Sequence, residues 1–339
     1  MDKLVLFNDS SRKKLLTKRS GESKFGQNVQ LLSNITNIYE QLLNLDVHYV
    51  ILGLPEDVGV IANHGKPGAC NTWIAVLKSL LNIQNNDFID ANKVLILGHL
   101  DFSDALTQVS NLNVDKKKDI LKARKLVSTI DQDVSNLIYQ IVSAGKIPII
   151  VGGGHNNAYG NIKGTALALN SKINVVNFDA HSDFRAEEGR HSGNGFSYAY
   201  AEGFLENYFI FGLHESYTSK KIFDTLNKLP SIKYNTYDAL EVREELSFKK
   251  ETIRALEHVS TDAFGIEIDC DAVQNISSSA LTPSGFSSKQ ARHFIYTIGK
   301  HENVKYLHIC EAIAKKKTAS QTGKFISYLI TDFIKANGY

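Results

Sequence analysis

The residues best suited to chemistry begin directly after an apolar, β-branched run at residues 173–178. They include Asp179, His181 and Asp183, spaced by two. Alternate side chains of an extended chain point to the same side, so these three side chains are expected to face one point. Two carboxylates and an imidazole in that arrangement can bind a divalent cation.

A second apolar run, residues 264–268, ends in Asp269, Cys270 and Asp271. The same spacing turns both aspartates to one side and the cysteine to the other. Glu267 shares the parity of the aspartates but lies one step further inside the predicted strand.

A third apolar run, residues 147–151, continues into three glycines and His155. Glycine permits a tight turn and a close backbone approach, and His155 would project from that turn. Together the three segments supply two imidazoles and four carboxylates, a ligand set that suits Mn²⁺ better than structural zinc. Two such ions about 3.5–4 Å apart can share a water, lower its pKa and direct it at an electrophilic carbon. The pattern therefore predicts a hydrolase with two manganese ions.

Each of these residues, taken singly, has a structural alternative. Asp179 or Asp183 could cap a helix, His155 could be a turn histidine and Asp269 could close a strand. Six such residues crowded together would repel one another without a cation, which favours the metal site.

Strands and helices must position these residues. Short apolar runs with strand character alternate with longer segments of helical spacing. Strands are expected at residues 47–54, 93–98, 147–151, 173–178, 208–213, 264–268 and 304–310, and helices at residues 114–144, 220–229, 288–299 and 324–336. This alternation predicts a mostly parallel sheet covered on both faces, with ligands outside the carboxyl ends of its strands. A single domain over residues 1–339 is the simplest interpretation, with residues 1–46 as an N-terminal extension packed on it.

The composition narrows the class of partner. The 339 residues are 43% hydrophobic and 22% charged with a net charge of +2, so neither nucleic acid nor an anionic membrane is an expected partner. Three scattered cysteines are too few for a disulfide framework and fit a reducing cytoplasm. The first residues do not resemble a signal peptide, and no segment approaches the roughly 20 apolar residues of a membrane span. We therefore expect a cytoplasmic enzyme acting on a small molecule.

At these residues the chain resembles the ureohydrolase superfamily, which includes arginase, agmatinase and formimidoylglutamase. The resemblance spans residues 47–335. Its motifs, in chain order, are Gly152-Gly153-Gly154-His155, Asn177-Phe178-Asp179-Ala180-His181-Ser182-Asp183 and Asp269-Cys270-Asp271. The resemblance implies a three-layer α/β/α arginase-like fold, two manganese ions, and a homo-oligomer that is a trimer or hexamer.

The same resemblance implies a role for each ligand. By motif position, one ion would be bound by His155 and Asp183 and the other by His181 and Asp271, with Asp179 and Asp269 bridging them.

The loop after the second motif bears on the substrate. Members that hydrolyse arginine carry a histidine shortly after a Ser-Gly-Asn sequence, and Phe196 stands at that place here. The loop and Arg185 look more like the formimidoylglutamase branch, as do residues 53–60 and 63–69. This branch converts N-formimidoyl-L-glutamate and water to glutamate and formamide, a step of histidine degradation.

Such a dianionic substrate requires cationic and polar partners, and arginine can bind a carboxylate through two hydrogen bonds. Contacts with the substrate are expected from Arg185, Ser192, Asn194, Asn63 and Lys66, with Arg190 as a further candidate. Arg185 is the strongest of these. Lys66 and Arg190 could instead be solvated surface charges.

Two residues are expected to act on the amidine group itself. Glu311 ends the last predicted strand and matches the family's glutamate near the amidine, where a carboxylate would orient the reacting carbon. The alternative is a strand-end charge, because Ala312-Ile313-Ala314 replaces the usual Asn-Pro continuation. His191 could transfer protons, since an unperturbed imidazole titrates near neutrality, and its alternative is a surface histidine.

Three other functions stay open. The first is an arginase- or agmatinase-type hydrolase that releases urea from a guanidino substrate. The second is a non-catalytic regulatory or assembly subunit with the same fold. The third is a metal-dependent deacetylase-like hydrolase.

Overall fold

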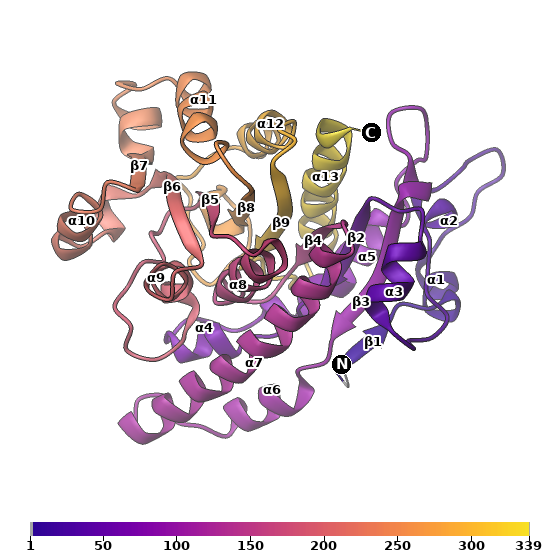
Figure 1. Ribbon diagram of the computed structural model, residues 1–339, viewed down its shortest axis with the longest axis horizontal. Coiled ribbons are helices and arrows are strands. Elements are labelled where there is room, and N and C mark those ends of the chain that lie inside the picture. The colour runs from indigo at the N-terminus through magenta and orange to yellow at the C-terminus, as the bar shows by residue number, and fades with distance from the viewer. Residues whose placement is uncertain (1–2, 339) are drawn as a thin grey trace.

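A central sheet organises the chain, as a computed structural model of residues 3–338 shows (Figure 1). The described residues contribute the following strands: β1 (Leu4–Leu6), β2 (Tyr49–Gly53), β3 (Val94–Leu100), β4 (Ile147–Val151), β5 (Ile173–Phe178), β6 (Leu205–Leu213), β7 (Ile232–Thr236), β8 (Phe264–Asp269) and β9 (Val304–Cys310). Their order across the sheet is β1-β3-β2-β4-β9-β8-β5-β6-β7. Within residues 3–338 every neighbouring pair is parallel except β1 and β3. The predicted mostly parallel sheet is confirmed.

The central strands are mostly apolar on both faces, which is why helices cover the sheet on both sides. In β2, Tyr49 and Ile51 pack into one apolar core, whereas Val50 and Leu52 pack into the other. All five residues of β2 are buried. A strand buried on both faces reads as a continuous apolar run, and this made the central strands predictable.

The helices form the outer two layers. They are α1 (Asp9–Leu15), α2 (Phe25–Asn28), α3 (Ile38–Asn44), α4 (Val58–Ala62), α5 (Thr72–Leu80), α6 (Ser103–Ser110), α7 (Lys117–Ser143), α8 (Asn157–Leu169), α9 (Gly195–Ala201), α10 (Lys220–Leu226), α11 (Phe248–Val259), α12 (Ser288–Ile298) and α13 (Ala319–Asn337). Helices α5, α11, α12 and α13 supply one core, and α3, α4, α7, α8 and α9 supply the other. Figure 1 shows α11, α12 and α13 along one side of the sheet and α7 and α8 along the other. The three-layer α/β/α arrangement predicted from the sequence is confirmed.

The two strands that sequence patterns missed lie at the two edges of the sheet. Strand β1 has three residues and pairs antiparallel with β3, and β7 carries polar residues among its apolar ones. The N-terminal residues thus extend the sheet, and Ile38 and Leu42 of α3 are buried against it. That the whole chain is one domain stays a prediction.

The path of the chain brings four strand ends together. After β4 the chain passes through α8 and enters the sheet again at β5, and β9 and β8 later fill the space between them. Such a reversal of strand order opens a crevice at the carboxyl ends of the strands, where ligands bind in open α/β sheets. Among the described residues, no helix combines the length and apolar character needed to cross a membrane.

Candidate metal centre

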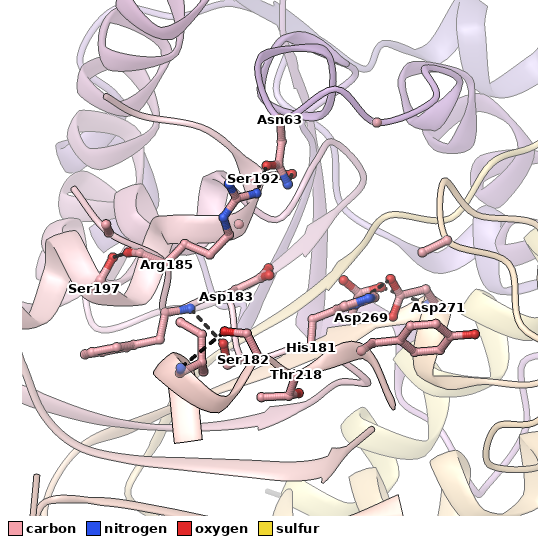
Figure 2. A pocket seen from close by; sticks show the side chains of 18 of the residues that line it. Asn63, His181, Ser182, Asp183, Arg185, Ser192, Ser197, Thr218, Asp269 and Asp271 are labelled. Atoms are coloured by element: carbon pink, nitrogen blue, oxygen red, sulfur yellow. Dashed lines mark hydrogen bonds and ion pairs between the residues drawn. The ribbon is translucent and has the colours of Figure 1, made fainter. Parts of the chain in front are cut away.

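The six predicted metal ligands meet at the carboxyl ends of β4, β8 and β5. The parallel register places Phe178 of β5 beside Ile268 of β8, so the aspartates that come after these two residues lie side by side. Figure 2 shows Asp183, His181, Asp269 and Asp271 together at the base of a pocket. We call His155, Asp179, His181, Asp183, Asp269 and Asp271 the six-residue cluster.

Distances within the cluster define two groups that share one aspartate. The Nδ1 atom of His155 lies 2.9 Å from Asp183 Oδ2, 3.2 Å from Asp179 Oδ2 and 3.3 Å from Asp269 Oδ2. The Nδ1 atom of His181 lies 3.1 Å from Asp271 Oδ2 and 3.6 Å from the other oxygen of Asp179. Ligand atoms of each group lie within 4.8 Å of one another, so each group is compact enough to hold one cation.

Turns, rather than the expected extended backbone, bring the side chains together. Residues 270–272 form a short 3₁₀ turn, and Asp269 Oδ1 accepts a hydrogen bond of 2.8 Å from the backbone N–H of Asp271. Asp179 Oδ1 likewise accepts one of 2.7 Å from the backbone N–H of His181. Asp183 adopts a φ of 43°, a left-handed conformation that aspartate enters more readily than most residues. The period-two argument selected side chains that the structure does bring together, but the expected extended geometry was wrong.

The glycine turn before His155 has the conformation that its sequence predicts. Gly153 has a φ of 74°, and an added Cβ would lie 2.8 Å from the carbonyl oxygen of Leu54. The fully buried Glu56, which lies in the segment 53–60 that resembles the formimidoylglutamase branch, accepts a hydrogen bond of 3.1 Å from the backbone N–H of Gly154 and one of 2.7 Å from Asn157 Nδ2. This carboxylate fixes the turn and, with it, the position of His155.

Crowding of carboxylates in a buried space shifts their pKa values. Burial, with the nearby charges of Asp271 and Asp179, raises the pKa of Asp269 well above its usual range. Burial and Asp179 also raise the pKa of Asp183. The carboxylate of Asp271 is the largest influence on His181 and raises its pKa. The raised pKa values mean that, without a cation, bound protons reduce the net negative charge of the cluster. A divalent cation could replace those protons.

The unsatisfied polar atoms support the same conclusion. Within residues 3–338, neither ring nitrogen of His155 has a hydrogen-bond partner, and neither does Asp271 Oδ1. Buried polar atoms of this kind are normally satisfied. A set of oxygen and imidazole ligands with free lone pairs fits a cation such as Mn²⁺.

A cavity of about 770 Å³ opens above the cluster. His181, Asp183, Asp269 and Asp271 line its base together with Glu311. Its wall includes the predicted substrate residues Asn63, Arg185 and Ser192, and also the unpredicted Glu187, Glu188, Tyr217 and Lys221.

Glu311 reaches this cavity from the end of β9. The side chain is buried, and its two oxygens accept hydrogen bonds from the backbone N–H of His155 at 2.9 Å and from Ser279 Oγ at 3.2 Å. Burial, together with the nearby Asp271 and Asp183, raises the pKa of Glu311 to about 8. The structure places Glu311 in the cavity lining, and its contact with the amidine stays a prediction.

Arg185 lies on the wall of the cavity with half of its side chain exposed. Its guanidinium donates to Asn63 Oδ1 at 2.7 Å and to Glu188 Oε1 at 3.2 Å. Asn63 in turn donates to Ser192 Oγ at 3.1 Å. Three of the five predicted substrate contacts therefore form one connected group, and Glu188 joins them.

Other predicted residues do not reach the cavity lining. Lys66 is exposed to solvent, as its structural alternative expected. Asn194 is buried, where its Oδ1 accepts from Arg190 Nη1 at 2.5 Å and its Nδ2 donates to the carbonyl of Gly189 at 2.9 Å. Asn194 thus organises the loop rather than the substrate.

Arg190 is neither in the cavity nor on the surface. It forms a buried ion pair with Asp131 of α7, with Nε 2.9 Å from Oδ2, and also donates to the carbonyl of Asn156 at 2.9 Å. The rings of Tyr159 and Tyr198 flank its guanidinium. Both interpretations of this arginine were wrong.

His191 is also buried, so it is not a surface histidine. Its Nδ1 accepts a hydrogen bond of 3.1 Å from the backbone N–H of Gly193, and its Nε2 lies 3.3 Å from Glu188 Oε1. Burial, together with surrounding cations of which Arg185 has the largest effect, lowers its pKa to about 3. A neutral, enclosed imidazole outside the cavity lining does not favour the predicted proton transfer.

Phe196, at the place where arginine hydrolysis would require histidine, is enclosed in the core beside the cluster. Its ring stacks on Tyr208 at 4.5 Å and meets the His155 ring edge-on at 5.2 Å. This aromatic packing supports the His155 ring from one side.

Known proteins resemble this chain in sequence. A model of the arginase family matches residues 47–335. The formimidoylglutamase of Chromobacterium violaceum is 26% identical over 247 residues, a match that covers 70% of each chain. That of Streptococcus pyogenes is 26% identical over 234 residues, which cover 67% of this chain and 65% of the relative.

Solved structures agree in fold. Formiminoglutamase of Trypanosoma cruzi with Mn²⁺ superposes with a TM-score of 0.67 at 19% identity, covering 88% of this chain and 97% of that one. Formimidoylglutamase of Bacillus subtilis gives a TM-score of 0.67 at 18% identity, covering 97% and 98%.

The chain belongs to the arginase family. Within this family its relatives support a hydrolase that acts on carbon–nitrogen bonds of linear amidines. The non-catalytic alternative is correspondingly disfavoured.

Proposed function

We propose that this protein hydrolyses N-formimidoyl-L-glutamate to L-glutamate and formamide, using two manganese ions held by the six-residue cluster. The observation that carries the proposal is that one cavity has four residues of the cluster and Glu311 at its base and Arg185 on its wall. The relatives that are named formimidoylglutamase and the Mn²⁺ named with the Trypanosoma cruzi structure support it.

The ligand groups in the structure support a division between two ions. One ion would be held by His155 and Asp183 and the other by His181 and Asp271, with Asp179 and Asp269 between them. Asp179 contacts both histidines through different oxygens, which supports a bridging role. When bound, the ions would lower the pKa of water, so that a nucleophilic hydroxide could form at neutral pH and attack the amidine carbon. They would also stabilise the charge that develops there.

Glu311 would orient the amidine. One of its oxygens is held by the backbone of His155 and the other by the hydroxyl of Ser279, so the carboxyl group has a fixed direction. Burial is the main cause of the raised pKa of Glu311, and a cation bound to Asp271 and Asp183 would remove the repulsion that adds to it, which would favour the ionised form of Glu311. An ionised Glu311 can pair with an amidinium and position its carbon.

Arg185 would bind a carboxylate of the glutamate part. Its guanidinium is half exposed, so the contact with Glu188 can yield to a substrate carboxylate. Asn63, which accepts a hydrogen bond from Arg185, would keep the side chain on the cavity wall. A planar guanidinium suits a carboxylate because two parallel hydrogen bonds can form.

A second candidate is hydrolysis of a cationic guanidino compound with release of urea. The observation in its favour is that Glu187 and Glu188 also line the cavity. Arg185 and Arg124 both lie 3.2 Å from Glu188 Oε1, however, and this neutralises much of its charge.

Product analysis separates the two candidates. The Mn²⁺-loaded protein would be supplied in parallel with N-formimidoyl-L-glutamate, arginine, agmatine and guanidinobutyrate, with formamide and urea measured separately. We expect formamide from the first compound and little urea from the others. The Asp271→Asn variant is the blank, because its fold should persist while its metal site is impaired. Urea as the main product would favour the guanidino substrate, and absence of both products would refute the hydrolase.

A further inference from the structure

A row of buried polar side chains lies one layer beneath the six-residue cluster. The sheet register places Asn177 of β5 beside Glu267 of β8, and Glu267 beside His308 of β9. All three are completely buried. Their apolar neighbours on β8, Ile266 and Ile268, point to the opposite core. Three polar groups in the centre of a sheet are costly unless they satisfy one another, so their arrangement requires an explanation.

Glu267 is the acceptor at the centre of this row. Its Oε1 accepts a hydrogen bond of 2.9 Å from the Tyr306 hydroxyl, and its Oε2 lies 2.5 Å from His308 Nδ1. The other ring nitrogen of His308 lies 3.4 Å from the carbonyl oxygen of Gly152, in the glycine turn that carries His155. Glu267 is therefore held from β9, and the same histidine connects it with the turn.

The same carboxylate faces the back of a cluster histidine. Glu267 Oε2 lies 3.5 Å from His155 Nε2, whereas His155 Nδ1 faces the three cluster carboxylates. A neutral imidazole carries one proton, and the hydrogen bond at one nitrogen decides which nitrogen is free to bind a metal. This 3.5 Å contact is longer than a hydrogen bond, but the Glu267 carboxylate is placed to attract the Nε2 proton, which would leave the Nδ1 lone pair directed into the cluster.

The second cluster histidine has different surroundings. The side chain of His181 is one-third exposed in the cavity, and its ring lies 6.3 Å from that of Tyr217. Glu267 faces His155 at 3.5 Å, whereas Asn177 of the same row donates to Asp179 Oδ2 at 2.9 Å. The effect of Glu267 should therefore fall on one of the two ions.

We infer that Glu267, held by His308 and Tyr306, is a positioning residue that fixes the His155 imidazole for the ion shared with Asp183. The inference rests on the proposed function, because it assumes that the six-residue cluster binds metal. Glu267 touches neither the cavity nor a substrate, and it acts only through His155.

The test is a titration of the purified chain with Mn²⁺, in which electron paramagnetic resonance measures the concentration of free Mn²⁺. The wild type is compared with Glu267→Gln, which keeps the size of the side chain but removes its negative charge and places an amide N–H group where one carboxylate oxygen stood. Loss of a partner behind a metal-bound histidine typically weakens metal binding about 10- to 100-fold. We expect that loss for one of two ions and unchanged affinity for the other. Tyr306→Phe removes one donor and should give a smaller change of the same kind.

A matched control separates this effect from general loss of stability. Asn174 is buried at the amino end of β5, far along the strand from the cluster, and its side chain donates to the carbonyl of Val259 at 2.8 Å and accepts from the N–H of Asn207 at 3.0 Å. Asn174→Ala should lower Tm and leave both Mn²⁺ affinities unchanged.

The outcomes are distinct. Wild-type affinity for both ions in Glu267→Gln would overturn the inference. A loss of affinity that is the same for both ions, and the same in Glu267→Gln and in Asn174→Ala, would overturn it as well. If Glu267→Gln does not fold, Tyr306→Phe decides, and an unchanged affinity in that variant would also overturn the inference. Failure of the wild type to bind Mn²⁺ would instead refute the proposed function and remove the basis of the inference.

Discussion

The base and the wall of the cavity are built in different ways. At the base, Asp269, Asp271 and Glu311 are buried, and backbone N–H groups hold the aspartates at the strand ends. On the wall, Arg185 and Glu188 expose about half of their side chains and are held by one another. The difference suggests that the base supplies the chemistry shared by the family and that the wall adjusts which molecule is positioned over it.

The largest expected effect comes from the base. Asp179→Asn or Asp269→Asn should abolish hydrolysis and metal content together, because each removes a charge that the ions require. Several kcal/mol of lost transition-state stabilisation corresponds to a decrease of at least ~1,000-fold in kcat. Activity and bound manganese would be measured on the same samples, with Asp224→Asn on α10 as the control. Normal activity in either cluster variant would contradict the proposed division of roles.

A second large effect concerns the stability of the fold outside the cavity lining, where Arg190 pairs with the buried Asp131. Arg190→Ala would leave Asp131 buried without its partner, and such a loss typically costs about 3–5 kcal/mol. Arg243→Ala removes an exposed pair with Glu215 and should cost about 1 kcal/mol or less. Urea unfolding of the two variants measures both. Equal costs would mean that burial of the Arg190 pair does not matter.

Removal of metal should destabilise the base without altering the wall. Mn²⁺ at 100 times its dissociation constant stabilises a protein by about 2.7 kcal/mol for each site that only the folded state binds. Thermal unfolding with Mn²⁺ and with a chelator should therefore differ clearly for the wild type. Asp179→Asn should show little difference, and a shift as large as that of the wild type would place the metal elsewhere.

The smallest effect is expected on the wall. Arg185→Ala removes one hydrogen-bonded charge contact, worth about 1.5–3 kcal/mol, and should raise KM for N-formimidoyl-L-glutamate roughly 10- to 100-fold with little change in kcat. Lys66→Ala, outside the cavity lining, should leave KM unchanged. If Arg185→Ala lowers kcat instead, the residue belongs functionally to the base.

The base was predictable because strand ends and spacing are local properties of the sequence. Apolar runs located β4, β5 and β8, and the residues just beyond the carboxyl ends of parallel strands lie at the same edge of the sheet. The turns at residues 179–183 and 270–272 could not be read from spacing, but they brought the same side chains together.

The wall was less predictable because long side chains can turn either way. Arg190 was expected in the cavity or in solvent, yet it pairs with Asp131, 59 residues earlier in the chain. His191 was enclosed by the same loop. No sequence pattern indicated that Glu188 and Lys221 line the cavity, because their positions depend on where α10 meets the loop that carries Glu188. A cytoplasmic location and a homo-oligomer stay predictions.

Anomalous diffraction at the manganese absorption edge, from crystals of the Mn²⁺-loaded protein, would locate the ions. Two peaks are predicted inside the six-residue cluster, one beside His155 and Asp183 and the other beside His181 and Asp271. A single peak, or peaks outside the cluster, would contradict the binuclear centre on which the proposed hydrolysis depends.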